Sequence, residues 1–137
     1  MIIFKDIEFY NFKPFYDKQV VKFPFKKDIK EKKLIVILAE NTKGKTSILE
    51  GFKWCFYGEQ NVRNKNLFNR IADREGKKTF YVTIQLLHNE DEYTLRREWR
   101  KETGIANLKI RKNNQPINED SNKRIIESLF PEQLCDY

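Results

Sequence analysis

The stretch that decides the fold runs from Lys33 to Gly58 and reads KLIVILAENTKGKTSILEGFKWCFYG. Its first part, residues 34–38, is an uninterrupted apolar run, which is typical of a strand buried on both faces of a sheet. A polar loop follows and leads into the tripeptide Gly44-Lys45-Thr46. We therefore predict a strand, a loop and then a helix, which is the structural context of a phosphate-binding loop.

The predicted helix has one apolar face and a glycine, Gly58, where a C-terminal cap belongs. The residues at helical spacing on this face are Ile48, Leu49, Phe52, Cys55 and Phe56. The alternative is a chance Gly-Lys-Thr between ordinary elements, which the flanking strand and helix disfavour.

The loop contains the residue types that polyphosphate binding requires. Gly44 has no Cβ, so the backbone N–H groups around it can approach a phosphate closely. We expect the Lys45 ammonium between the β- and γ-phosphates of ATP, and the Thr46 hydroxyl on Mg²⁺. The helix adds its dipole and its free N–H groups. Ala39 stands in the first glycine position of the pattern G-x-x-x-x-G-K-[ST], which puts the loop conformation and the affinity in question.

The composition is that of one globular domain of 137 residues, with 39% hydrophobic residues and no run long enough to span a membrane. The balance of 27 Lys and Arg against 20 Asp and Glu permits nucleic-acid binding, but acids and bases are interleaved as on an ordinary solvated surface. Cys55 and Cys135 form no disulfide or metal pattern, which favours free thiols in a reducing cytoplasm.

Strands are predicted on both sides of the loop and helix. Residues 2–12, with Ile3, Ile7 and Phe9 at even spacing, predict a first strand, and residues 21–25 predict a second one antiparallel to it. The polar connection 59–78 is long, and Leu67, Phe68 and Ile71 are expected to anchor a helical turn in it. From Thr79 the alternation predicts a meander of three antiparallel strands with a short fourth at 115–117. Asp120 or Ser121 then caps a final helix.

This pattern is an α/β fold of the P-loop NTPase class with an antiparallel β-meander. The expected parts are a P-loop part at 1–78, the meander at 79–118, and a helix at 119–137. On the meander, Arg96, Arg100, Lys109 and Arg111 are predicted to point away from the apolar face. No strand ending in an acidic Walker B pair follows Ser47, and no Leu-Ser-Gly-Gly signature is present, so we assign no catalytic residue within the chain.

The order of these motifs resembles the N-terminal ATPase lobe of the SMC and SbcC-type DNA-repair ATPases. The resemblance rests on Asn11-Phe12 at the end of the first strand and on the P-loop continued by Ser47-Ile48-Leu49-Glu50 and closed by Tyr57-Gly58. Within this group, Leu129-Phe130-Pro131 is most similar to DndD, the ATPase of DNA phosphorothioation systems.

The resemblance implies that ATP and Mg²⁺ are held by Asn41, Thr42, Lys43, Gly44, Lys45, Thr46 and Ser47. It further implies that Lys13 lies near the nucleotide, with Arg63 as a weaker candidate of the same kind. It implies that the chain is an incomplete half-domain. In proteins of this kind the N-terminal lobe is followed by a coiled coil and then by a C-terminal lobe with the Walker B and signature motifs. Such a protein would be an ATPase only when completed, would form a homodimer around ATP, and would act on DNA.

Two other functions remain open from the residues alone. A small P-loop kinase is one, although the meander disfavours it because such kinases continue through alternating strands and helices. A nucleotide-binding module without turnover is the other, suggested by Ala39 and by the absent Walker B element.

Overall fold

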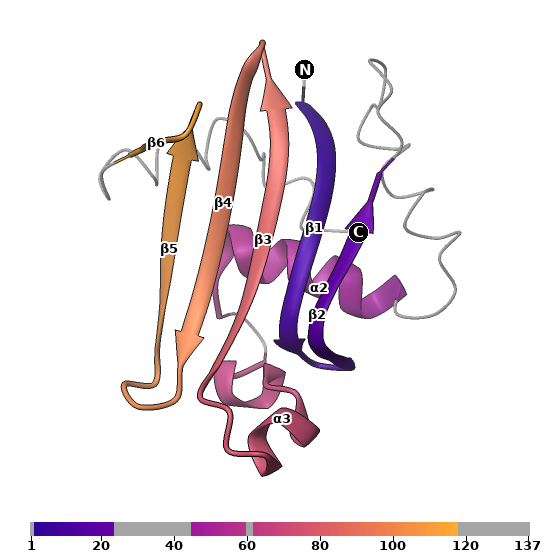
Figure 1. Cartoon of the computed structure of the whole chain (residues 1–137), viewed down its shortest axis with the longest axis vertical. Helices are drawn as coiled ribbons and strands as arrows, with labels where there is room; N and C mark the ends of the chain where they lie inside the picture. Colours follow the sequence, from indigo (N-terminus) through magenta and orange to yellow (C-terminus); the bar gives the residue numbers. More distant parts are fainter. Residues whose placement is uncertain (1, 24–44, 60–61, 118–137) are drawn as a thin grey trace.

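The computed structural model describes residues 2–23, 45–59 and 62–117 (Figure 1). The predicted strand at 34–38, the loop at 39–44 and the predicted C-terminal helix therefore lie outside the described residues. Within them the chain forms one six-stranded antiparallel sheet with the order β2-β1-β3-β4-β5-β6. The strands are β1 (Ile2–Phe12), β2 (Phe15–Lys22), β3 (Thr79–His88), β4 (Asp91–Arg100), β5 (Ile105–Lys112) and β6 (Gln115–Pro116).

The helices are few, and the longest, α2 (Lys45–Tyr57), lies across one face of the sheet (Figure 1). A 3₁₀ helix, η1 (Asn64–Leu67), and a short helix, α3 (Arg70–Arg74), follow it. We call the face under α2 the inner face and the opposite face the outer face. The helix predicted from apolar spacing is confirmed, and it ends at Gly58, which has a φ of 77°.

The meander is confirmed as predicted, with β3, β4 and β5 joined by tight turns. Asn89 and Glu90 form the first turn and Asn113 and Asn114 the third, and all four have a positive φ, as type I′ hairpin turns require. The two N-terminal strands are also confirmed. The second begins earlier than predicted, at Phe15, because a turn at Lys13-Pro14 reverses the chain directly after β1.

The even spacing that predicted β1 does not hold along the whole strand, since Phe4 rather than Ile3 joins Ile7 and Phe9 in the core. The pairing of β1 with β3 shifts register between Phe4 and Asp6. This bulge inserts one residue into the alternation, so the inward side changes from even to odd positions along the strand.

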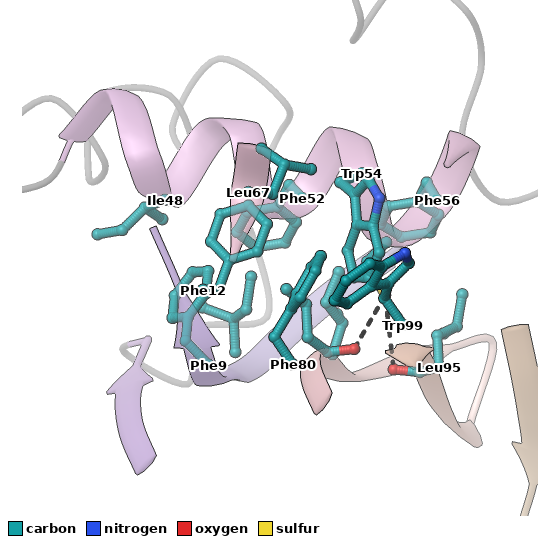
Figure 2. Packing of buried hydrophobic residues seen from close by; sticks show 14 of the residues in the cluster. Phe9, Phe12, Ile48, Phe52, Trp54, Phe56, Leu67, Phe80, Leu95 and Trp99 are labelled. Carbon is teal, nitrogen blue, oxygen red and sulfur yellow. Dashed lines mark hydrogen bonds between the residues drawn. The ribbon is translucent and has the colours of Figure 1, made fainter. Parts of the chain in front are cut away.

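The core lies between α2 and the inner face and is rich in aromatic rings (Figure 2). Phe80 of β3 is at its centre, with ring centroids 4.9 Å from Trp54 and 5.3 Å from Trp99. The helix approaches the sheet closely at Gly51, where an added Cβ would lie 2.3 Å from Cε1 of Phe9. Because Gly51 has no side chain, the middle of α2 can pack directly against β1.

The connection after α2 matches its prediction only in part. Leu67 and Phe68 are buried as expected, but Ile71 is 54% exposed and Ala72 is buried in its place. The cause is the start of α3: the Asn69 side chain accepts a hydrogen bond from Ala72 N (3.0 Å) and so caps the helix. This cap sets the rotation of α3 and turns Ile71 outward. In the described part of the chain, no helix is long and apolar enough to cross a membrane.

Candidate nucleotide site

The helix that follows the phosphate-binding motif begins at Lys45, so Lys45, Thr46 and Ser47 occupy its first turn. Residues 41–44 lie outside the described residues, and so do the side chains of Lys45 and Thr46. No acidic residue is present in this first turn. The positive end of the helix dipole is therefore not neutralised by a carboxylate on α2 itself, which favours binding of an anion.

Lys13 comes from the turn between β1 and β2 and reaches α2. Its Nζ lies 2.5 Å from Oε2 of Glu50, and the two side chains are 29% and 31% exposed. Glu50 follows Thr46 by four residues, so both share one helix face, and side chains on a helix lean toward its N-terminus. The Lys13 ammonium therefore lies alongside the first turns of α2.

The backbone of Lys13 is held on both sides by the last residue of η1 and by a residue that follows it. Lys13 N–H donates to Leu67 O (2.7 Å), and Asn69 Nδ2 donates to Lys13 O (2.7 Å). Asn69 N–H in turn donates to Asn11 O (2.8 Å), and the backbones of Phe12 and Phe68 form an isolated antiparallel β-bridge. Asn69 is therefore a functional candidate that the sequence analysis did not identify, because its partner lies 56 positions away in the chain.

The turn that carries Lys13 is also conformationally unusual. Asn11, Lys13 and Asp17 all have a positive φ (51°, 50° and 57°). The Asn11 side chain accepts a hydrogen bond from Asp17 N (2.6 Å) and is buried, and its Nδ2 has no hydrogen-bond partner among the described residues. Non-glycine residues adopt this backbone region only where surrounding contacts impose it.

Arg63 is exposed and precedes η1. Its neighbour Asn64 accepts a hydrogen bond from Trp54 Nε1 (2.9 Å), and Asn64 N–H donates to Glu59. These contacts place the start of η1 beside the C-terminal half of α2. Of the two cations proposed from the resemblance, Lys13 is therefore the one with a described contact near the start of the helix.

The other end of α2 has a half-buried cation, Arg97 of β4. Its Nε donates to Cys55 O (3.1 Å), one of the last carbonyls of the helix. Burial lowers the pKa of the Arg97 guanidinium below its usual value, while the nearby Cys55 side chain acts in the opposite direction. α2 has no basic residue in its own last turn, so Arg97 supplies from the sheet the positive charge that favours a helix C-terminus.

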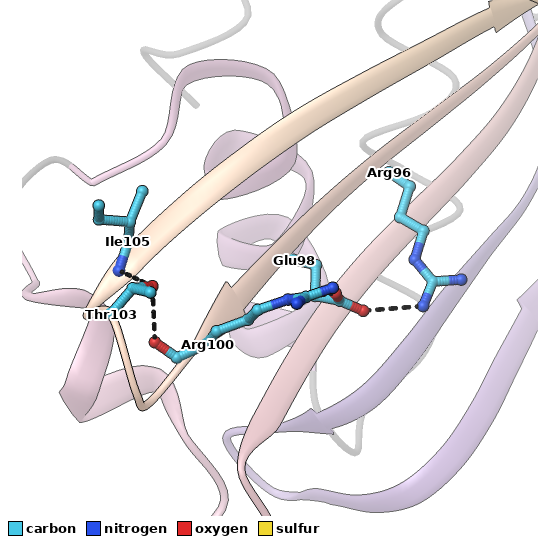
Figure 3. A network of polar contacts seen from close by, with 5 residues as sticks. All are labelled: Arg96, Glu98, Arg100, Thr103 and Ile105. Carbon is cyan, nitrogen blue, oxygen red and sulfur yellow. Dashed lines mark hydrogen bonds and ion pairs between the residues drawn. The ribbon is translucent and has the colours of Figure 1, made fainter.

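A second surface is the outer face at β4 and β5, where Arg96, Arg100, Lys109 and Arg111 line one shallow hollow. All four are exposed and point away from the apolar face, as predicted. Glu98 lies between the first two of these cations, 3.0 Å from Arg96 and 3.3 Å from Arg100 (Figure 3). Arg96 also lies 3.7 Å above the ring of Tyr81. Among the described residues, Lys109 and Arg111 form no ion pair, so they carry most of the uncompensated positive charge of the hollow.

A family model described as an AAA domain matches residues 6–134 of the chain. The chain belongs to this family. It is also 30% identical over 115 residues to the DNA double-strand break repair Rad50 ATPase of Methanocaldococcus jannaschii. That match covers 84% of this chain but only 10% of the Rad50 protein.

The fold has a counterpart among solved structures. The chain superposes with a TM-score of 0.59 on a structure from work on the ATP-driven dimerization and DNA-stimulated activation of SMC ATPases. The two share 14% identity, and the match covers 95% of this chain and 82% of the other. The chain therefore shares its P-loop NTPase fold with SMC ATPases, and the prediction of this fold is confirmed. The narrower resemblance to DndD finds no support in these matches.

Proposed function

We propose that this chain is the ATP-binding lobe of an SMC/Rad50-type ATPase that acts on DNA. The observation that carries the proposal is the start of α2 at Lys45, directly after the glycine of the P-loop motif, in a first turn without acidic residues. Family membership supports ATP and Mg²⁺ as the ligands. Asn41 to Ser47 would surround the phosphates, with Lys45 as the principal cation and Thr46 as the Mg²⁺ ligand.

The residues present are suited to binding. When bound, Mg²⁺ would neutralise charge on the β- and γ-phosphates. Lys45 and the N–H groups of the first helical turn would do the same from the protein side. Lys13 would add a second cation, since its ammonium lies beside the same end of α2. All of these contacts stabilise bound ATP, and none of them activates a water molecule.

The test is ATP binding measured by calorimetry in the presence of Mg²⁺. Replacing Lys45 with alanine removes a charge-assisted contact and is expected to weaken binding by about 1.5–3 kcal/mol. Lys53→Ala, which removes the same charge from the same helix two turns later, is the matched control and is expected to bind as the wild type does. Equal affinities for the wild type and Lys45→Ala would refute the phosphate-loop assignment.

The process that the lobe serves is DNA repair, DNA sulfur modification or anti-phage defence, and the likeness to the Rad50 repair ATPase favours repair. The buried free thiol of Cys55 is in keeping with work in the reducing cytoplasm. The kinase alternative is disfavoured by the family match and by the antiparallel meander. A lobe that binds ATP without ever supporting turnover remains the main competitor, and the hydrolysis experiment in the Discussion separates the two.

We further propose that DNA binds the hollow on the outer face through its phosphates. Both faces of the Tyr81 ring are covered, one by Arg96 and the other by Tyr10, whose ring stacks at 5.0 Å. No base can therefore stack on Tyr81 without displacing a neighbour, and the exposed cations Lys109 and Arg111 are left to contact phosphates.

Duplex DNA binding measured across a salt series tests this surface. The double variant Lys109→Met/Arg111→Met is expected to bind more weakly at low salt, and its salt slope should fall by about 0.9 for each lost contact. Arg96→Met should have a smaller effect, because Glu98 already compensates this cation. Lys78→Met, an exposed cation outside the hollow, is the control. Unchanged affinity and slope in the double variant would place DNA elsewhere.

A further inference from the structure

We infer that Asn69 is a positioning residue for ATP binding, because it holds the backbone of Lys13 and thereby fixes the Lys13 ammonium beside the start of α2. This inference rests on the proposed function, since it assumes that ATP binds at that end of the helix.

The backbone of Lys13 is fixed first. With a φ of 50°, Lys13 occupies a region that a lysine in a free turn rarely adopts. Its N–H and its C=O are both engaged, by Leu67 O and by Asn69 Nδ2. Leu67, the last residue of η1, and Asn69, which lies just beyond it, therefore hold this conformation from both sides, and among the described residues only the Asn69 side chain forms a hydrogen bond with the Lys13 backbone.

The second step concerns the direction of the side chain. The hydrogen bonds on both backbone groups fix the orientation of the Cα–Cβ bond, and the ammonium ends 2.5 Å from Glu50 on α2. Glu50 and Thr46 share one helix face, so the ammonium lies near the residues expected to bind Mg²⁺ and phosphate. A lysine whose backbone is already fixed loses less conformational entropy when it contacts a ligand, and this preorganisation favours binding.

The third step separates the two roles of the Asn69 side chain. Its Nδ2 donates to Lys13 O, whereas its Oδ1 accepts from Ala72 N and caps α3. Aspartate keeps an acceptor at the cap and is itself a good N-cap residue, but it cannot donate to Lys13 O. Asn69→Asp should therefore release Lys13 while leaving α3 capped.

The experiment is a double-mutant cycle on ATP affinity, measured by calorimetry with Mg²⁺ on the 137-residue chain. Lys13→Met, which keeps an unbranched side chain, is expected to weaken binding about tenfold. Lys18→Met removes the same charge from the outer face, where Lys18 pairs with Glu8, and should leave affinity unchanged. Asn69→Asp is expected to weaken binding about threefold and to have no effect once Lys13 is methionine.

The possible outcomes separate this inference from the proposed function. If Asn69→Asp lowered ATP affinity equally in the wild-type and Lys13→Met backgrounds, the added negative charge would act on ATP directly and not through Lys13. This result would overturn the inference. No loss for Asn69→Asp in the wild-type background would overturn it as well. If Lys45→Ala weakens binding but Lys13→Met does not, the inference fails and the proposed function stands. If the wild type binds no ATP, both fail. Unfolding curves for Asn69→Asp close to the wild type, with a loss for Asn69→Ala, would support the separation of the two roles.

Discussion

Cys55 shows at the scale of a single residue how the core changes side-chain chemistry. Its Sγ lies 3.5 Å from Val82 O and 3.7 Å from Leu95 O, inside the contact between α2 and the sheet. Burial raises the pKa of this thiol from 9.0 to about 12, although Arg97 acts in the opposite direction. The thiolate is therefore unavailable near neutral pH, and Cys55 is a packing residue rather than a nucleophile.

A pH dependence of stability follows from this thiol. The folded protein holds the proton to about pH 12, whereas the unfolded chain releases it near pH 9. The stabilisation is therefore complete below pH 9 and is lost as the pH rises through this window. Cys55→Ala should cost about 1–2 kcal/mol at neutral pH through the cavity that it leaves. Its free energy of unfolding should then fall less steeply above pH 9 than that of the wild type.

Denaturant titrations at several pH values provide the measurement. Tyr81→Phe is the control. The pKa of Tyr81 is raised from 10.0 to about 12, mainly by burial and then by its hydrogen bond to Glu8. The effect of Tyr81 on stability should therefore change only above pH 10, later than that of Cys55. If the difference in free energy of unfolding between the wild type and Cys55→Ala stayed constant from neutral to alkaline pH, the raised pKa of Cys55 would be contradicted.

Among the elements, α2 links the phosphate-binding loop to the sheet and is held at both ends. Near its start Glu50 pairs with Lys13, and at its end Gly58 N–H donates to Trp54 O (2.8 Å) while Arg97 donates to Cys55 O. Gly58 has two reasons to be glycine. Its φ is 77°, and an added Cβ would lie 3.3 Å from Nη1 of Arg97.

The chain contains a matched pair of glycines that separates these two reasons. Gly76 has a similar φ of 82°, but an added Cβ there would meet nothing within 4 Å. Gly76→Ala should therefore cost only the backbone strain, roughly 1–2 kcal/mol, and Gly58→Ala should cost more because Arg97 must move. Chemical denaturation of both variants gives the comparison. In an Arg97→Met background the two costs should converge, and equal costs in the wild-type background would exclude crowding by Arg97.

For the molecule as a whole, the sheet separates two proposed surfaces. The inner face carries α2 and the outer face carries the basic hollow, and β4 contributes to both because its side chains alternate. Arg97 points inward to α2, whereas Arg96 and Glu98 point outward. ATP and DNA would therefore bind on opposite sides of a single sheet.

Hydrolysis is the prediction that belongs to this scale. The 137 residues contain no Walker B acid and no signature motif, so the chain alone should bind ATP yet hydrolyse it negligibly. Adding a C-terminal lobe of the same protein type, with both motifs, should restore phosphate release and promote ATP-dependent dimerisation. Steady-state phosphate release, with Lys45→Ala as the control, is the measurement. Robust turnover by the chain alone, insensitive to the added lobe, would favour the kinase alternative.

Local patterns in the sequence determined which elements form. The apolar stripe of α2, the alternation in β3 to β5 and the paired turn asparagines each depend on residues close in the chain, so their periods could be read directly. The cations of the outer face followed from the same alternation. The residues of the P-loop motif were also identified in this way, and their placement stays a prediction because residues 41–44 lie outside the described part.

Tertiary structure alone decided the contacts between distant residues. The bulge in β1 that brings Phe4 into the core depends on pairing with β3, and the outward turn of Ile71 depends on the cap from Asn69. The hydrogen bond from Asn69 to Lys13 O and the contact of Arg97 with the end of α2 join segments 56 and 42 positions apart. No local period encodes such contacts, because they form only where the packing of separate elements brings unpaired polar groups within hydrogen-bonding distance.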